Sequence, residues 1–293
     1  MIVCLGDLVE DVVVWLRGPI AAGTDTPSRV TRCRGGSAAN VAAFVAQSGG
    51  ASRFIGTVGD DPLGRQLVAQ LSDLGMDVVV QHRGRTGSIV VLVAADGERS
   101  FLTDRGSSSD VDPVPPAALE NAHWLHVPAY CLAHEPLATV ATNALASAQS
   151  LGVQLSVDCS STALLETFGP ERFLSWLAEV APDVVFANEA EAVLLSLHQR
   201  WAGPGLLVIK HGPAPVELIL GNGSVTQVPV EPVATVHDAT GAGDAFAAGF
   251  LLARSAGATV VEAASAGSRL AGRVLAQPGA SMQSLNTLAT GES

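Results

Sequence analysis

The stretch from residue 238 to residue 244 combines small residues with carboxylates in a pattern that suits phosphate chemistry. It reads Asp-Ala-Thr-Gly-Ala-Gly-Asp and leads into a helical pattern. Small residues at a helix start leave the N–H groups of Gly241, Ala242 and Gly243 open to an anion, and the helix dipole adds partial positive charge. A carboxylate there repels phosphate unless it takes a proton from a hydroxyl that attacks the phosphate. We therefore predict phosphoryl transfer with Asp244 as the base, while a helix cap alone would also account for this aspartate.

A second glycine motif, in residues 35–42, reads Gly-Gly-Ser-Ala-Ala-Asn-Val-Ala. It matches the pattern G-G-x-x-x-N-x-A, and residues 238–244 match D-T-x-G-A-G-D with Ala239 in place of the first Thr. Together and in this order, the two motifs resemble the signatures of the PfkB, or ribokinase-like, carbohydrate kinase family, and the resemblance extends over nearly the whole chain. It implies an ATP-dependent kinase that phosphorylates a hydroxyl, expected to be primary, of a small sugar or sugar-like molecule.

The resemblance also implies a set of substrate-binding residues. Asp11 matches the aspartate that grips sugar hydroxyls, and its carboxylate suits a vicinal diol because it accepts two hydrogen bonds. Gly35, Gly36 and Asn40 would bring backbone and a side-chain amide to the same sugar.

Two further residues leave the substrate class open. Tyr130 follows a strand pattern where ribokinase-like proteins usually carry a carboxylate, which argues against ribose. An aromatic ring there would stack on a base, so a nucleoside such as pseudouridine or adenosine is one alternative substrate. Arg105, with Arg99, would instead suit an acidic sugar of the 2-keto-3-deoxygluconate type, although the chain's own formal charge of −12 disfavours anions.

For ATP and its metal ions, the resemblance implies a separate group of residues. Asn188 and Glu191 match the element N-x-x-E, and Glu191 would hold Mg²⁺ through water. Lys210 and Gly212 match the nucleotide loop and would bind ATP with Asn188, Gly241 and Gly243. The loop departs from the family pattern in its Pro-Ala-Pro run at 213–215, and residues 263–276 lack the usual adenine-side asparagine.

A monovalent-cation site is a further implication of the resemblance. In many members of the family K⁺ is held at the positions of Asp238 and Thr240 together with a closing loop, matched here by Gly279. Activation by K⁺ is therefore a hypothesis for this chain.

Strand and helix patterns must alternate to position these residues. We predict strands over 2–5, 52–56, 124–127, 154–158, 184–187 and 205–210, and helices over 38–48, 62–74, 137–150, 171–180, 189–197 and 244–255. This alternation is typical of a doubly wound, mostly parallel α/β sheet covered by helices on both faces. Residues 1–10, 35–84 and 105–293 form the predicted core, and Val/Thr-rich residues 11–34 and 85–104 form a small inserted antiparallel β lid. Because exposed lid edges invite pairing, a homodimer through the lid is a further hypothesis.

Composition excludes several other classes of protein. The 293 residues include 16 basic and 28 acidic side chains with no basic run, so we expect no nucleic-acid partner. A signal peptide and an apolar run of membrane-spanning length are not recognised, so we expect a soluble cytoplasmic protein without a membrane partner. The four cysteines lack CxxC spacing, and the histidines, including His198 and His211, show no metal-ligand pattern.

Two alternatives from other classes stay open. A sugar-binding relative without activity is disfavoured by the intact 241–244 segment. A dinucleotide-dependent oxidoreductase needs a glycine-rich turn after the first strand, and Gly6-Asp7 does not provide one.

Overall fold

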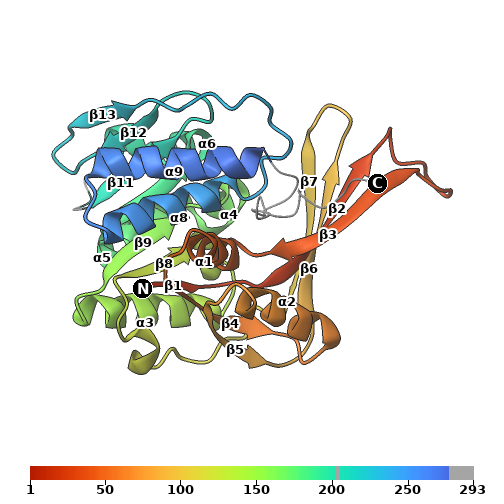
Figure 1. Ribbon diagram of the computed structural model, residues 1–293, viewed down its shortest axis with the longest axis horizontal. Helices are drawn as coiled ribbons and strands as arrows, with labels where there is room; N and C mark the ends of the chain where they lie inside the picture. The colour runs from red at the N-terminus through yellow and green to blue at the C-terminus, as the bar shows by residue number, and fades with distance from the viewer. Residues whose placement is uncertain (202, 204, 277–293) are drawn as a thin grey trace, which may run out of the picture.

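The computed structural model describes residues 1–201, 203 and 205–276, and these residues form a large α/β core with a smaller sheet projecting from one side (Figure 1). The core sheet has nine strands in the order β13-β12-β11-β10-β9-β8-β1-β4-β5. From β11 to β5 all neighbours are parallel, whereas β12 and β13 extend the sheet as antiparallel strands. The carboxyl ends of the parallel strands therefore meet at one edge, where sheets of this kind bind ligands.

The strands of the core sheet are β1 (Ile2–Leu5), β4 (Ser52–Val58), β5 (Asp77–His82), β8 (Trp124–Pro128), β9 (Gln154–Asp158), β10 (Val184–Asn188), β11 (Leu206–Lys210), β12 (Val216–Ile219) and β13 (Val225–Val228). The helices are α1 (Ser37–Gln47), α2 (Pro62–Ser72), α3 (Leu137–Ser150), α4 (Thr162–Phe168), α5 (Pro170–Val180), α6 (Glu189–Leu194), α7 (Leu197–Arg200), α8 (Ala242–Ser255) and α9 (Val260–Leu275), with short 3₁₀ turns η1 (Pro116–Leu119) and η2 (Ala129–Leu132).

Helices cover both faces of the core sheet. The side chains of successive strand residues point to opposite faces, so they pack into two different apolar clusters. In β1, Ile2 and Cys4 pack into an apolar cluster that includes residues of α1, α2, α8 and α9. Val3 and Leu5 pack into a second cluster with residues of α3, α5 and α6 on the other face. This arrangement explains why the strands are near-continuous apolar runs, as parallel sheets require.

The smaller sheet has the strand order β3-β2-β6-β7, formed by β2 (Val9–Leu16), β3 (Ser28–Gly35), β6 (Thr86–Val93) and β7 (Arg99–Gly106). Its two outer pairs are antiparallel, as predicted. The central pair, β2 and β6, is parallel. The reason is topological, since β2 continues from β1 and β6 continues from β5, and these two core strands run in the same direction. Asp11 lies within β2.

The junction between the core and this second sheet is fixed by Asp61. Its carboxylate caps α2 by accepting from the Gly64 N–H at 2.7 Å. It also accepts from the Thr86 N–H at 2.8 Å and from the Thr86 hydroxyl at 2.7 Å. One aspartate therefore joins the start of α2 to the start of β6.

The predicted alternation of strands and helices is confirmed, with local differences. The predicted helix 189–197 is two helices, α6 and α7, because Ser196 adopts a left-handed conformation with φ 52°. Strands β5, β12 and β13 and helix α4 were not predicted. β12 and β13 are only four residues long, whereas β5 contains an apolar run, Val78 to Val80, that was not assigned to a strand. Among the described helices, none is long and apolar enough to cross a membrane.

Candidate active site

A cleft of about 1040 Å³ opens between the carboxyl edge of the core sheet and the second sheet. Residues from segments far apart in the sequence line it, from Asp7 near the start of the chain to Leu275 at the end of α9. Every site residue predicted within the described chain lines this cleft except Gly35, Arg99 and Asp238, each of which directly contacts a residue of the lining. Gly279 lies outside the described residues.

Asp244, in the first turn of α8, is held by two side chains of α1. Its Oδ1 accepts from the Ser37 hydroxyl at 2.7 Å, and its Oδ2 accepts from the Asn40 amide at 2.9 Å. Burial raises the pKa of Asp244 to about 7, and the hydrogen bonds from Ser37 and Asn40 only partly offset this effect. The carboxylate is thus fixed in position and poised to exchange a proton near neutral pH. Asn40, expected to bind sugar, contacts the catalytic candidate itself.

The start of α8 also shapes the expected phosphate-binding turn. Gly241 is the N-cap residue with φ 75°, a left-handed conformation that favours glycine. The Ala242 N–H donates to the Ala239 carbonyl at 3.3 Å, so this N–H is already engaged in a turn. A Cβ on Gly243 would lie 3.4 Å from Lys210 Nζ, which places the only described lysine beside this turn.

Asp11 and the adjacent glycines form a second polar group in the cleft. Burial raises the pKa of Asp11 to about 6, although the charge of Arg34 lowers it. A Cβ on Gly35 would lie 2.2 Å from Asp11 Oδ1, so glycine is required for the carboxylate to occupy its position. Gly36 has φ 98°, and a Cβ there would lie 2.1 Å from the Asp7 carbonyl oxygen. The double glycine therefore allows two polar segments to pack closely.

Lys210, at the end of β11, forms an ion pair with Asp158 at the end of β9. Its Nζ lies 2.9 Å from Asp158 Oδ2. Burial alone lowers the pKa of Lys210, but the charges of Asp158 and Glu191 more than offset burial and raise it, so this lysine is a fixed cation in the cleft. Asp158 was not singled out in the sequence; its position at the end of a predicted strand was the available signal.

Asn188 and Glu191 form a reciprocal capping box at the start of α6. Glu191 Oε2 accepts from the Asn188 N–H and Oε1 from the Asn188 amide, both at 2.8 Å. Burial and the nearby charge of Asp158 raise the pKa of Glu191 to about 7. Glu191 is thus both part of a helix cap and one of two neighbouring buried carboxylates. A bound cation would relieve the repulsion between Asp158 and Glu191.

The two described residues of the expected K⁺ site contact an arginine of the second sheet. Arg99 Nη2 lies 2.6 Å from Asp238 Oδ1, and Arg99 Nη1 donates to the Thr240 hydroxyl at 2.7 Å. The same Asp238 oxygen accepts from the Thr240 N–H and hydroxyl. The guanidinium of Arg99 therefore supplies positive charge at this carboxylate, at the position where the K⁺ hypothesis places the ion.

Arg105 is likewise engaged within the protein. It forms an ion pair with Asp7 and lies over the ring of Tyr130, 4.8 Å from the ring centre. The Tyr130 hydroxyl donates to the Ser160 carbonyl at 3.3 Å. Arg105 and Tyr130 thus lie together in the cleft, and each has a further partner of its own.

The far end of the cleft is apolar and lies between β12 and α9. The apolar residues that line this end are Val216, Val230, Val233, Val236, Ala271 and Leu275. Ser268 of α9 also lines the cleft, and within the described residues its buried hydroxyl has no hydrogen-bond partner. Ser268 was not predicted as a site residue, because the family pattern has an asparagine and not a serine on the adenine side. Gly212, with φ 61°, turns the chain after β11 at this end.

Comparisons with known proteins agree with this geometry. The sequence matches the model of pfkB family carbohydrate kinases over residues 1–287. A fructokinase from Klebsiella pneumoniae is 34% identical over 267 residues, which cover 84% of this chain and 82% of that protein. The adenosine kinase structure from Sinorhizobium meliloti has a TM-score of 0.85 at 24% identity and covers 97% of this chain and 95% of its own. A fructokinase with bound ATP from Xylella fastidiosa has a TM-score of 0.81 at 24% identity, with 95% and 93% covered. The structural likenesses establish a common fold.

Proposed function

Because the chain belongs to the pfkB family of carbohydrate kinases, we propose that it transfers the γ-phosphoryl group of ATP to a primary hydroxyl of a small neutral sugar, with fructose as the first candidate. The observation that carries this proposal is the buried carboxylate of Asp244, held by Ser37 and Asn40 in the first turn of α8. The kinase relatives with similar sequences, such as the Klebsiella fructokinase, support the choice of sugar.

In the proposed reaction, Asp11 accepts hydrogen bonds from sugar hydroxyls and orients the acceptor. Asp244 removes the proton of the primary hydroxyl as its oxygen attacks the γ-phosphorus; the bond from that phosphorus to the β–γ bridging oxygen breaks, and ADP leaves. The N–H groups of Gly241 and Gly243 at the positive end of α8, together with Lys210, stabilise negative charge on the transferred group. Ala242 plays a smaller part because its N–H is engaged with Ala239.

We propose Mg²⁺ as the metal ion that accompanies ATP. The carboxylates of Glu191 and Asp158 would hold it, directly or through water, beside the phosphates, and their mutual repulsion supports this assignment. The ion would neutralise charge on the phosphate oxygens. Asn188 would act by orienting Glu191 through the capping box. The apolar end of the cleft, with the Ser268 hydroxyl, would receive the adenine ring.

Contacts in the cleft support a neutral sugar over the two alternatives. An acidic sugar needs free cations, but Arg99 is bound to Asp238 and Arg105 to Asp7. A nucleoside base would need the face of Tyr130, and one face is covered by Arg105. Apolar side chains of the second sheet, Ile89 and Phe101, line the cleft opposite the polar floor, as suits a sugar ring.

ADP release with Mg-ATP tests this proposal against fructose, ribose, glucose, 2-keto-3-deoxygluconate, adenosine and pseudouridine. We expect fructose or another neutral sugar to give the highest kcat/KM. A preference for adenosine, pseudouridine or the acidic sugar would replace the neutral-sugar assignment, and the absence of turnover with every compound, in a protein that binds ATP, would refute it.

A further inference from the structure

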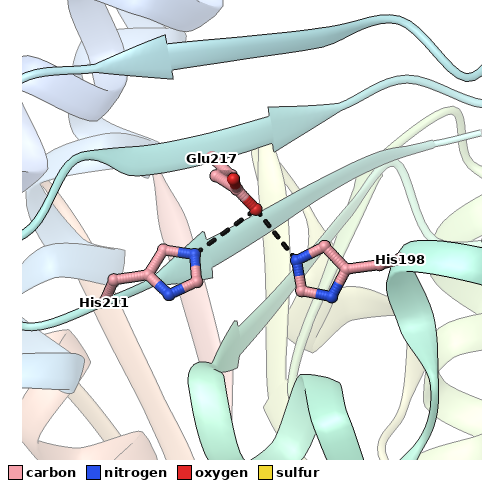
Figure 2. A group of neighbouring side chains, drawn as sticks. All are labelled: His198, His211 and Glu217. Carbon is pink, nitrogen blue, oxygen red and sulfur yellow. Dashed lines mark hydrogen bonds and ion pairs between the residues drawn. The ribbon is translucent and has the colours of Figure 1, made fainter.

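Three side chains outside the cleft lining converge at the β12 side of the core sheet. His198 comes from α7, His211 directly follows β11, and Glu217 lies in β12 (Figure 2). One ligand atom of each lies within 4.8 Å of the others. None of these three residues has a role in the proposed phosphoryl transfer, so their convergence calls for a separate explanation.

The distances between these atoms are close to those between ligands of one metal ion, and one of them falls within that range. The His198 Nε2 lies 2.9 Å and the His211 Nε2 lies 3.4 Å from the same oxygen, Glu217 Oε2. Metal–ligand distances of about 2.0–2.2 Å in a tetrahedral zinc site place neighbouring ligand atoms about 3.3–3.6 Å apart. The His211 nitrogen is already at this spacing from the Glu217 oxygen. A small movement of the half-exposed His198 would bring its nitrogen to the same spacing.

The state of His211 is an independent observation that favours a ligand. Its Nε2 is buried and makes no hydrogen bond within the described part of the chain, although Glu217 lies nearby. A buried ring nitrogen without a hydrogen bond carries a desolvation cost. Coordination of a metal ion would use the lone pair of this nitrogen and remove that cost.

Outer partners lie next to two of the three side chains, and one of them orients Glu217. The other ring nitrogen of His211, Nδ1, lies 3.8 Å from Glu189 Oε2, and histidine ligands commonly present that nitrogen to a carboxylate. Gln227 Nε2 donates to Glu217 Oε1 at 3.2 Å, which turns the other oxygen toward both histidines. Three protein ligands leave one position of a four-coordinate site open, and water can reach it because His198 is 37% exposed.

We propose that His198, His211 and Glu217 form a binding site for a divalent transition-metal ion, with Zn²⁺ as the ion that best fits two imidazoles and a carboxylate. Because His211 lies between Lys210 and Gly212, occupancy of the site would immobilise the turn at the nucleotide end of the cleft. The site is distinct from the Mg²⁺ position, which would use Glu191 and Asp158.

Equilibrium dialysis of chelator-treated full-length protein against Zn²⁺, without nucleotide, tests the site. We expect one equivalent per chain, and at least tenfold weaker binding after His198→Ala or Glu217→Gln. His82→Ala is the matched control because His82 is exposed at the opposite edge of the core sheet, in β5. Circular dichroism establishes that each variant is folded.

Co²⁺ in place of Zn²⁺ gives a second readout that does not depend on activity. We expect the visible absorption of four-coordinate Co²⁺ in the wild type and in His82→Ala, and its loss in His198→Ala. The proposal is overturned if the wild type binds no Zn²⁺ at micromolar concentrations, or if His198→Ala and Glu217→Gln bind it as tightly as the wild type. Neither outcome would affect the proposed kinase activity.

Discussion

At the level of single residues, Asp244 combines burial with two hydrogen bonds, and this combination determines how activity should depend on pH. The carboxylate acts as a base only when ionised, and its pKa is raised to about 7 by burial. We expect kcat/KM for the sugar to fall as the pH decreases below about 7, since the protonated fraction of Asp244 grows. A pH–rate profile between pH 5.5 and 8.5 measures this limb.

Unfolding does not explain such a limb. Because the pKa of Asp244 in the folded protein lies above its ordinary value of 3.8, the fold favours the protonated form. The contribution of this group to stability is therefore fully present at low pH and is lost as the pH rises toward about 7. Glu191, whose pKa is also raised to about 7, is the control: Glu191→Gln should retain the acidic limb. A profile that is flat in the wild type, or a limb that disappears in Glu191→Gln, would contradict the assignment to Asp244.

Gly35 provides a second prediction at this scale. A Cβ at this position would lie 2.2 Å from Asp11 Oδ1, so Gly35→Ala should turn the short Asp11 side chain away from the sugar while leaving the backbone intact. We expect KM for the sugar to rise about tenfold or more, with little change in KM for ATP. Steady-state kinetics for both substrates separate these effects. The control is Gly18→Ala, since nothing lies within 4 Å of a Cβ there; equal kinetics for the two variants would count against a role for Asp11.

At the level of elements, Arg99 joins the second sheet to the loop that precedes α8. It starts β7 and contacts both Asp238 and Thr240, so it connects the wall over the cleft with the proposed phosphate-binding turn. Removal of this guanidinium takes away the ion pair of a carboxylate that is only 2% exposed. Charged hydrogen bonds of this kind contribute about 1.5–3 kcal/mol.

We therefore expect Arg99→Ala to lower kcat by about 10-fold to 100-fold and to increase hydrogen exchange in β6 and β7. Arg85→Ala is the matched control, because Arg85 pairs with Asp104 at the exposed surface of the same sheet.

Since Arg99 supplies positive charge at Asp238, we also expect the wild type to be as active in Na⁺ as in K⁺. Strong activation by K⁺, or wild-type kinetics in Arg99→Ala, would show that Arg99 does not have this role.

The elements also show where sequence reasoning succeeds. The buried parallel strands are apolar runs bounded by clear turn residues, and the periodic helices α1, α3 and α8 are equally distinct, so they were predicted to within a few residues. The antiparallel strands β12 and β13 are only four residues long and follow a Pro-Ala-Pro run. Their identity depends on pairing with β11, which no local pattern reveals.

At the level of the whole molecule, the partners of the site residues could not be predicted from the sequence, because they come from distant parts of the chain. The two glycine motifs predict Asp244 and Asn40 as site residues, but not that one binds the other across more than 200 positions. The engagement of Arg99 and Arg105 within the protein, and the convergence of His198, His211 and Glu217, depend on tertiary packing in the same way. Sequence motifs thus identify residues of the site, whereas the contacts between these residues become visible only in the folded structure.

The second sheet makes assembly a testable property of the whole molecule. Its edge strands β3 and β7 carry exposed apolar side chains, among them Val30 and Leu102. Unpaired edges of this kind favour association with another copy. We expect light scattering after size exclusion to give twice the 29.9 kDa chain mass, and Leu102→Glu to shift the protein toward the single-chain mass. A wild-type mass of 29.9 kDa at high concentration would contradict a homodimer through this sheet.

The most direct test of the account is the turnover of Asp244→Asn. Asparagine keeps the size of the side chain, so the protein should fold and bind ATP as the wild type does, but it cannot accept the proton of the sugar hydroxyl. We predict that kcat for sugar-dependent ADP release falls by about 10²-fold to 10⁴-fold, while the dissociation constant for ATP changes little. Sugar-dependent turnover at the wild-type rate in Asp244→Asn would contradict the role of Asp244 as the base.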